Sequence, residues 1–257
     1  MGDPYTQVAL VIIALLAGVG ITAIGPGGIF LTISLYALLP ITPPVIAGTA
    51  SATFIATGLV GTYIYARSGQ LTAGPNRLLA VLLSGASIAG ALAGAAINPL
   101  VSKALFGGLL GVMAIAAGVL IVVQQARGLT PKAELDPGTT RGQVITVGIG
   151  LGIGLAGALL GVGGPVLAVP ALVVLGVPML IAVAVAQVQS VFVSGFATIG
   201  YMFQGAVSWP LALLVGVPQL LGVLAGWWIA LRTEPRKLKF ILGGVLVAVG
   251  IYLILRG

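Results

Sequence analysis

The sequence contains no cysteine and no histidine, and only 6% of its 257 residues are charged. Without these residue types the chain has no disulfide, no thiolate or imidazole metal ligand and no histidine proton relay. An ordinary soluble domain carries about 25% charged residues, so the low charge excludes that class. The fifteen charged residues lie in or at the edges of loops, outside the middle of any apolar segment. We therefore expect no metal site, no cofactor and no enzyme activity, because no general base is evident.

Hydrophobic residues make up 59% of the chain and recur in segments of about the length that crosses a bilayer. This pattern predicts an all-α, polytopic membrane protein. The start lacks a basic region and a cleavage site, so the first segment is expected to be a retained helix and not a signal peptide. The expected segments are 6–24, 27–39, 44–66, 77–97, 101–124, 143–161, 164–176, 179–203, 209–231 and 238–255.

Two related glycine clusters interrupt the apolar segments. "AIGPGGIF" at 23–30 and "LLGVGGPV" at 159–166 each precede a segment of about 13 residues. The clusters align at an offset of 136 residues, and the same offset places Tyr65 on Tyr201. This repetition indicates an internal duplication. We expect an N-terminal repeat over 1–126, a cytoplasmic linker over 127–142 and a C-terminal repeat over 143–257.

The distribution of basic residues predicts how the two repeats are oriented. If both short segments change sides, nine of the eleven basic residues lie on one face, leaving Lys103 and Arg256 on the other. If the short segments return to the face they left, the split is six to five and carries no orientation signal. The first arrangement makes the repeats inverted, which is typical of transporters with broken helices. It predicts a multi-pass cell-membrane protein with both termini outside and the 125–142 loop in the cytoplasm.

The breaks also indicate where a ligand would bind. A helix that begins at a glycine cluster exposes free N–H groups and the positive end of its dipole, which suits an anion. The stretches "AGTASATFIATG" and "AVAQVQSVFVSG" supply neutral hydrogen-bonding side chains, Thr57 and Ser194 among them. The residues expected to bind the substrate are Gly27, Gly28, Thr49, Ser51, Thr53, Gly163, Gly164, Gln187, Gln189 and Ser190.

Each of these features also has a structural interpretation. Glycine clusters in membrane helices serve close helix packing, and serine or threonine hydroxyls bond back to their own helix. A net charge of +7 would fit nucleic acid, but the basic residues lie in the loops and set topology instead. The expected partners are a small anionic substrate and membrane lipids, without nucleic acid, and a homo-oligomer stays open. A secondary transporter is the leading hypothesis, and an anion or small-solute channel is the alternative.

The residues at the second break resemble a known family. "GALLGVGGPVLAVPALVVLGVP" at 157–178 is similar to the glycine-rich signature of the TauE/SafE family of sulfite exporters, G-x-G-G followed by an apolar stretch and V-P. "GPGG" and "AGTAS" in the first half resemble the same family less closely. The sequence departs from the family pattern at Ile29 and Pro165, which stand where a third glycine is usual. The resemblance implies transport of sulfite, a sulfonate or a related sulfur-containing anion.

Overall fold

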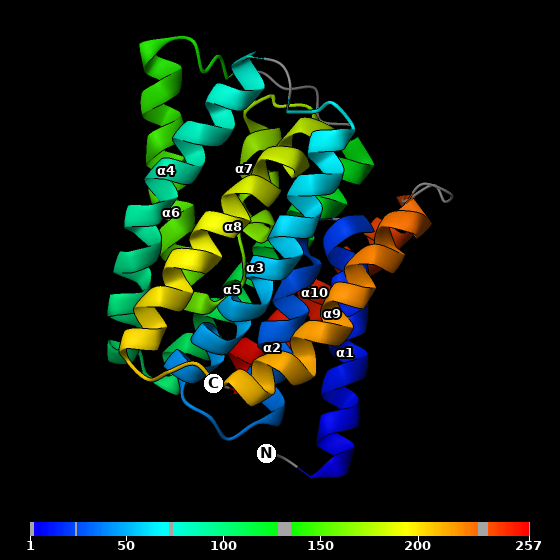
Figure 1. Ribbon diagram of the computed structural model, residues 1–257. Helices are drawn as coiled ribbons and strands as arrows, with labels where there is room; N and C mark the ends of the chain where they lie inside the picture. Colours follow the sequence, from blue (N-terminus) through cyan, green and yellow to red (C-terminus); the bar gives the residue numbers. More distant parts are fainter. Residues whose placement is uncertain (1–2, 24, 72–73, 128–134, 231–235, 257) are drawn as a thin grey trace.

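The computed structural model describes residues 3–23, 25–71, 74–127, 135–230 and 236–256, and within these ranges its regular secondary structure is all helical (Figure 1). Seven of its helices are long and apolar enough to cross a membrane. These helices are typical of a multi-pass membrane protein. The α-helices are α1 (Pro4–Ala23), α2 (Ile29–Leu38), α3 (Pro43–Arg67), α4 (Gly74–Ile97), α5 (Lys103–Arg127), α6 (Thr140–Leu160), α7 (Pro165–Val174), α8 (Met179–Phe203), α9 (Trp209–Ala230) and α10 (Arg236–Arg256). Two 3-10 turns complete the elements, η1 (Pro26–Gly28) and η2 (Asn98–Leu100).

The ten apolar segments expected from the sequence correspond to these ten helices, so the all-α prediction is confirmed. Two of them, α1 and α6, begin with side-chain caps. The Asp3 carboxylate accepts hydrogen bonds from the Thr6 side chain and the Thr6 backbone N–H, and these bonds lower the pKa of Asp3. Thr139 caps α6 by accepting a hydrogen bond from the N–H of Gly142 at 3.1 Å.

The two helices after the glycine clusters are short. α2 and α7 each have 10 residues, which corresponds to about 15 Å at 1.5 Å per residue. That is about half the thickness of a hydrocarbon core. In the first half α1 rises from the N terminus and α2 returns toward the same end (Figure 1). Each short helix therefore begins inside the bundle, beside longer neighbours.

Helices from the two halves interleave across the front of the bundle, where Figure 1 shows α6, α4, α8, α3, α9 and α1 side by side. α5 and α10 form a further pair, and α2 and α7 both contact α5. If each helix of the first half is exchanged with its counterpart in the second, α1 is replaced by α6 and α9 by α4. The α1–α9 interface then becomes the α6–α4 interface, whereas the α3–α8 and α5–α10 pairs are unchanged. The helix pairs thus follow the exchange that the 136-residue offset in the sequence predicts.

Close glycine contacts show the direction of each pair. Along α4 and α6 the contacts advance together, from Leu83 with Gly150 to Ser87 with Gly154, so these helices run parallel. The α1–α9 pair behaves in the same way. Along α3 and α8 the contacts run in opposite senses, from Gly48 near Tyr201 to Gly61 near Gln187, and these helices are antiparallel. The α5–α10 pair is antiparallel as well.

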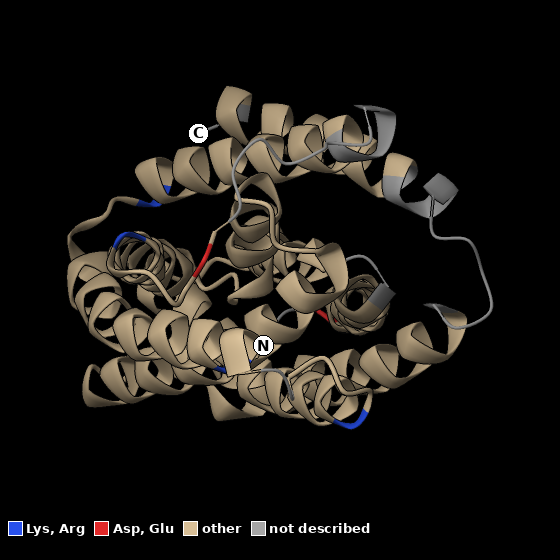
Figure 2. Cartoon of the chain, turned by 90° about the horizontal axis from the view of Figure 1, so that it is seen from above, with Lys and Arg blue, Asp and Glu red and all other residues tan. Residues whose placement is uncertain are grey.

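Charged residues are sparse in the described part of the chain, as the coloured positions along the backbone show in the view from above (Figure 2). Arg67 ends α3, and Arg77 and Arg141 lie in the first turns of the parallel helices α4 and α6, so these three share one end of the bundle. Lys103 begins α5 at the opposite end, 3.4 Å from the carbonyl oxygen of Leu39. Lys132 and Arg232, which contribute to the predicted charge asymmetry, lie outside the described residues.

Candidate functional site

The second glycine break is a sharp turn between α6 and α7. Gly161 adopts a left-handed conformation with φ of 60°, and its N–H donates to the carbonyl of Ala158. A Cβ atom at Gly161 would lie 2.4 Å from Cα of Ala47. Both the conformation and the close approach require glycine. α7 then begins at Pro165, whose fixed φ suits the first helical position.

The first break is built differently. Gly25 has φ of 106°, and a single 3-10 turn over 26–28 leads directly into α2. Gly27 packs against α1, where an added Cβ would lie 2.3 Å from the carbonyl carbon of Gly20. The three residues of the turn are buried. Glycine therefore serves both a turn and a close helix contact at each break, and the buried 3-10 turn is what distinguishes the first.

The two breaks meet at a small cavity. An added Cβ at Gly28 would lie 3.5 Å from the carbonyl oxygen of Val162, and one at Gly25 would lie 3.6 Å from the Val169 side chain. The cavity has a volume of about 10 Å³, close to the lower limit for one water molecule. Its lining is uncharged and consists of Ile21, Gly25, Gly28, Phe54, Thr57, Val162, Gly163, Pro165, Val166, Gln187 and Ser190.

Phe54 of α3 is the bulkiest side chain in this lining. Its ring lies between the two breaks, 2.8 Å from a Cβ built at Gly28 and 3.3 Å from one built at Gly163. Only 2% of Phe54 is exposed. Gly28 and Gly163 both lack a Cβ, and this leaves room for the Phe54 ring between the breaks. Side chains at these two positions would crowd the ring.

Polar groups line the α3 and α8 sides of the cavity. The Gln187 side chain occupies the room left by Gly61. A Cβ added at Gly61 would lie 2.6 Å from Oε1 of the Gln187 side-chain amide. Gln187 is 1% exposed, and its Nε2 has no hydrogen-bond partner among the described residues. Ser190 lies one turn further along α8, and the Thr57 hydroxyl donates to the carbonyl of Phe54 at 3.2 Å. Gln187, which lines the cavity, thus has an unpaired amide donor, and such a donor is costly in an apolar interior.

Side chains from other helices satisfy the carbonyl groups at the end of α6. The Thr32 hydroxyl of α2 donates to the carbonyl of Gly161. The Tyr201 hydroxyl of α8 donates to the carbonyl of Ala158 at 2.9 Å, and the Asn98 amide donates to the carbonyl of Leu159. The C-terminal carbonyls of a helix have no intrahelical partner, so these bonds allow α6 to end inside the bundle.

Four of the ten sequence-predicted binding residues line this cavity: Gly28, Gly163, Gln187 and Ser190. Gly27 and Gly164 lie beside it and face other helices. Gly27 contacts Gly20, and an added Cβ at Gly164 would lie 3.0 Å from the backbone of Ser190. Close packing is the physical reason for glycine at these two positions.

The other four predicted residues lie elsewhere. Nε2 of Gln189 donates to the Ser87 hydroxyl of α4 at 2.6 Å. The Thr49 hydroxyl accepts a hydrogen bond from the N–H of Ser208 at 3.1 Å, which ties α3 to the segment before α9. The Thr53 hydroxyl bonds back to the carbonyl of Ala50. Ser51 is buried without contributing to the lining.

Several lining residues were absent from the sequence-based site. Phe54 resembles an ordinary core residue, and no sequence signal separates it from one. Thr57 is different, because it lies three residues after Phe54 and four before Gly61, on one face of α3. Helical spacing therefore identifies it once Phe54 is known to face the cavity.

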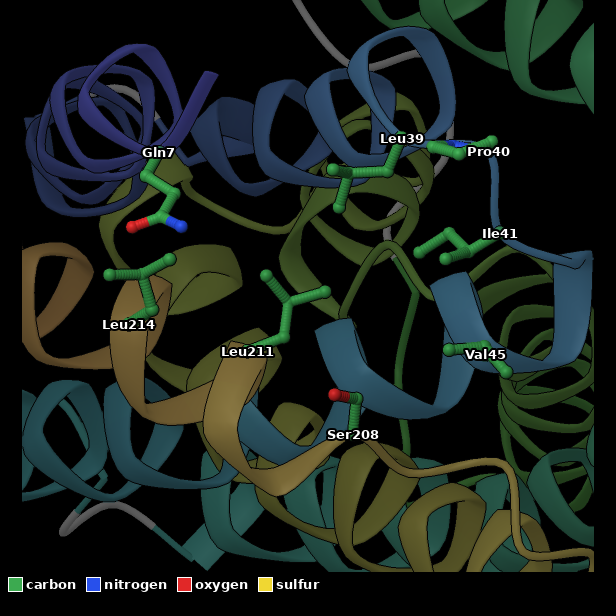
Figure 3. Close-up of a pocket in the computed structure, with 8 residues that line it drawn as sticks. All are labelled: Gln7, Leu39, Pro40, Ile41, Val45, Ser208, Leu211 and Leu214. Atoms are coloured by element: carbon green, nitrogen blue, oxygen red, sulfur yellow. The ribbon is translucent and has the colours of Figure 1, made fainter. Parts of the chain in front are cut away.

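A larger pocket opens at the end of the bundle where the chain begins (Figure 3). It has a volume of about 240 Å³. Side chains from α1, the α2–α3 loop, α3, α9 and the residue before α9 surround it, with Gln7 and Ser208 as its polar members. Ser208 also bonds Thr49 through its N–H. This pocket, which we call the vestibule, thus adjoins the polar face of α3.

Comparison with known proteins places the chain in one family. The model of the sulfite exporter TauE/SafE family matches residues 10–253. The probable membrane transporter protein YunE of Bacillus subtilis (strain 168) is 27% identical over 271 residues, which cover 97% of this chain and 98% of that protein. No solved structure matches the chain.

Proposed function

The chain belongs to the sulfite exporter TauE/SafE family, and from this premise we propose that it is a secondary transporter of a small sulfur-containing anion. Sulfite, a sulfonate or a related compound is the substrate class. Binding takes place in the cavity between the two glycine breaks, with alternating access from the two faces. The name of the similar B. subtilis protein, a probable membrane transporter, supports the transport part of this proposal.

The unpaired Nε2 donor of Gln187 carries the proposal. An anion needs hydrogen-bond donors, and it would satisfy this amide. Two helix N-termini contribute about 0.3 to 1 kcal/mol each, or up to about 2 when partly buried, whereas burying an ion costs several kcal/mol. Charge-assisted hydrogen bonds add about 1.5 to 3 kcal/mol each. Gln187, together with the Ser190 hydroxyl, supplies such bonds and closes the difference.

The described conformation is closed and too small for the substrate. Sulfite has four heavy atoms, whereas the cavity of about 10 Å³ barely admits one water molecule. Phe54 fills the space between the breaks, so its ring must move before an anion enters. In this mechanism Phe54 separates the empty, closed state from a state that binds substrate, and the vestibule provides access from one face.

Inverted repeats complete the proposed mechanism. The antiparallel α3–α8 and α5–α10 pairs and the parallel α1–α9 and α4–α6 pairs support the division into repeats at 1–126 and 143–257. If the short segments returned to the face they left, α3 and α8 would run in the same direction. Because basic residues favour the cytoplasmic side, the end with Arg67, Arg77 and Arg141 faces the cytoplasm. Both termini then lie outside.

Transport assays test the proposal. The purified protein is reconstituted into liposomes, and flux of sulfite and short sulfonates is measured under imposed pH and sodium gradients. We expect saturable flux that one of the gradients drives uphill, with acetate and chloride as control anions. Flux that never saturates and cannot be driven uphill would identify a channel instead. Equal transport of the control anions would contradict the sulfur-anion assignment.

A further inference from the structure

We propose that the groove between α4 and α8 binds an anionic phospholipid, with the lipid phosphate at Arg77. The groove has a volume of about 430 Å³. It is lined by Leu71, Arg77, Ala80, Val81, Ser84, Gly85, Val188 and Phe192. None of these residues belongs to the transport cavity, so the proposal does not depend on the transported substrate.

The α4 wall of the groove is a single helical face. Its members follow Arg77 at intervals of three, four, seven and eight residues, which places them above one another along α4. Ala80, Ser84 and Gly85 are small and leave the groove open. A Cβ at Gly85 would meet no atom within 4 Å.

The groove faces the surroundings of the bundle. Val81 is 61% exposed and Phe192 is 39% exposed, and both lie on helices long enough to span the membrane. In a bilayer these exposed apolar side chains contact acyl chains, because no water is present at that depth. An acyl chain is therefore the apolar part of the occupant.

The polar groups of the groove select the headgroup. Arg77 is the fourth residue of α4, close to the start of a helix long enough to cross the membrane, and its guanidinium pairs well with phosphate oxygens. Basic pockets between membrane helices bind anionic headgroups in this way. The two described acidic residues, Asp3 and Asp136, accept hydrogen bonds from Thr6 and Gly138 near their own helix starts. The phosphodiester of an anionic phospholipid therefore supplies the counter-charge for Arg77. The rest of the headgroup is a second anionic group or a neutral polar group.

Ser84 supplies a second contact. Its hydroxyl is buried and has no hydrogen-bond partner among the described residues. Ser84 lies seven residues after Arg77, or about 10 Å along the helix. A phosphate bound at Arg77 and an acyl-ester carbonyl that accepts from Ser84 span this separation within one glycerophospholipid. The orphan hydroxyl and the guanidinium thus bind the same molecule.

Native mass spectrometry of the full-length protein, titrated with phosphatidylglycerol or phosphatidylcholine, tests the site. We expect one phosphatidylglycerol to bind more tightly than phosphatidylcholine. Arg77→Gln should weaken phosphatidylglycerol binding about tenfold or more, the loss of one charge-assisted hydrogen bond. Gly85→Leu, which fills the groove, should weaken both lipids.

Matched variants provide the controls. Arg67→Gln removes a basic residue at the same end of the bundle, where Arg67 lies 4.9 Å from the centre of the Tyr63 ring. Gly152→Leu adds the same bulk at an exposed position of α6 that also has no atom within 4 Å. Both should bind lipid as the wild type does. Equal binding of the two lipids to the wild type, or unchanged binding in Arg77→Gln and Gly85→Leu, would overturn the proposal. Dissociation of a dimer by Gly85→Leu without loss of lipid would identify a second copy as the occupant.

Discussion

The two glycine breaks align at one offset in the sequence, yet they fold differently. At the first break a 3-10 turn begins at Pro26, and Gly27 faces α1 while Gly28 faces the cavity. At the second break the helix begins at Pro165, and Gly163 faces the cavity while Gly164 faces α8. The cavity is therefore lined by Gly28 and Gly163, which are not equivalent under the 136-residue offset.

The position of proline explains this shift. Proline favours the first position of a helix, where its missing N–H is not needed. In the first break it precedes the glycine pair and begins the 3-10 turn over 26–28, whereas in the second it follows the pair and begins α7 directly. The helices α2 and α7 themselves begin at offset-equivalent residues, Ile29 and Pro165, so the difference lies in the turn before them. A duplicated motif can thus present different residues to one site. The asymmetry extends to α3 and α8, where Phe54 and Ser190 occupy offset-equivalent positions on the cavity wall.

The largest expected effect is on folding, from Gly161→Ala. The left-handed conformation costs about 1 to 2 kcal/mol for a residue with a Cβ, and overpacking against Ala47 adds about 1 to 3. Gly25→Ala at the first break has a positive φ but room for a Cβ, so it should cost about 1 to 3 kcal/mol. Thermal unfolding in detergent measures the difference, with Gly152→Ala, inside α6 and with room for a Cβ, as the control that should not destabilise the protein. Equal destabilisation at both breaks would contradict the comparison.

The next effect distinguishes the two glutamines of α8. Gln187→Leu removes the cavity donor and should abolish transport in liposomes while the protein stays folded. Gln189→Leu breaks the hydrogen bond to Ser87 and should cost about 1 kcal/mol of stability, with transport retained. Flux assays and thermal unfolding of both variants provide the measurements. Wild-type flux in Gln187→Leu would remove this residue from the proposed site.

A smaller effect is expected at Phe54, the bulky member of the Phe54–Ser190 pair. Phe54→Leu shortens the side chain between the breaks and should admit larger sulfonates, raising their flux severalfold relative to sulfite. The measured quantity is the ratio of the two fluxes, which a general loss of folded protein does not change. Phe106→Leu, at a buried position outside the cavity lining, is the control. An unchanged ratio would show that Phe54 does not limit substrate size.

The smallest effects concern the prolines. Pro26→Ala and Pro165→Ala each increase the freedom of the unfolded chain, and each should lower stability by about 0.4 to 1 kcal/mol. If the prolines set where each helix begins, Pro165→Ala should also change the substrate affinity of the site, whereas a purely structural proline would leave it unaltered. Thermal unfolding measures the stability of each variant, and substrate titration in the same detergent samples measures the affinity.

Much of the fold follows from the sequence because the membrane imposes simple rules. The length of each apolar segment predicts the ten helices, and the glycine clusters predict where α2 and α7 begin. The site is less predictable. The sequence motif predicts both Gln187 and Gln189 as site residues. Residues two apart lie on opposite faces of a helix, so helical periodicity is enough to separate these two glutamines. The place of Phe54 could not be predicted, because it depends on the meeting of α3 with breaks that are distant in the sequence.

The hydrogen bonds at the end of α6 have an electrostatic consequence. The last carbonyls of a helix form the negative pole of its dipole, and α6 ends beside the cavity where α7 begins. The Thr32 and Tyr201 hydroxyls direct their hydrogens at two of these carbonyls and so offset that pole locally. To the proposed anionic substrate the cavity then presents mainly the positive pole of α7. Two neutral hydroxyl groups thereby favour the binding of an anion in the proposed site.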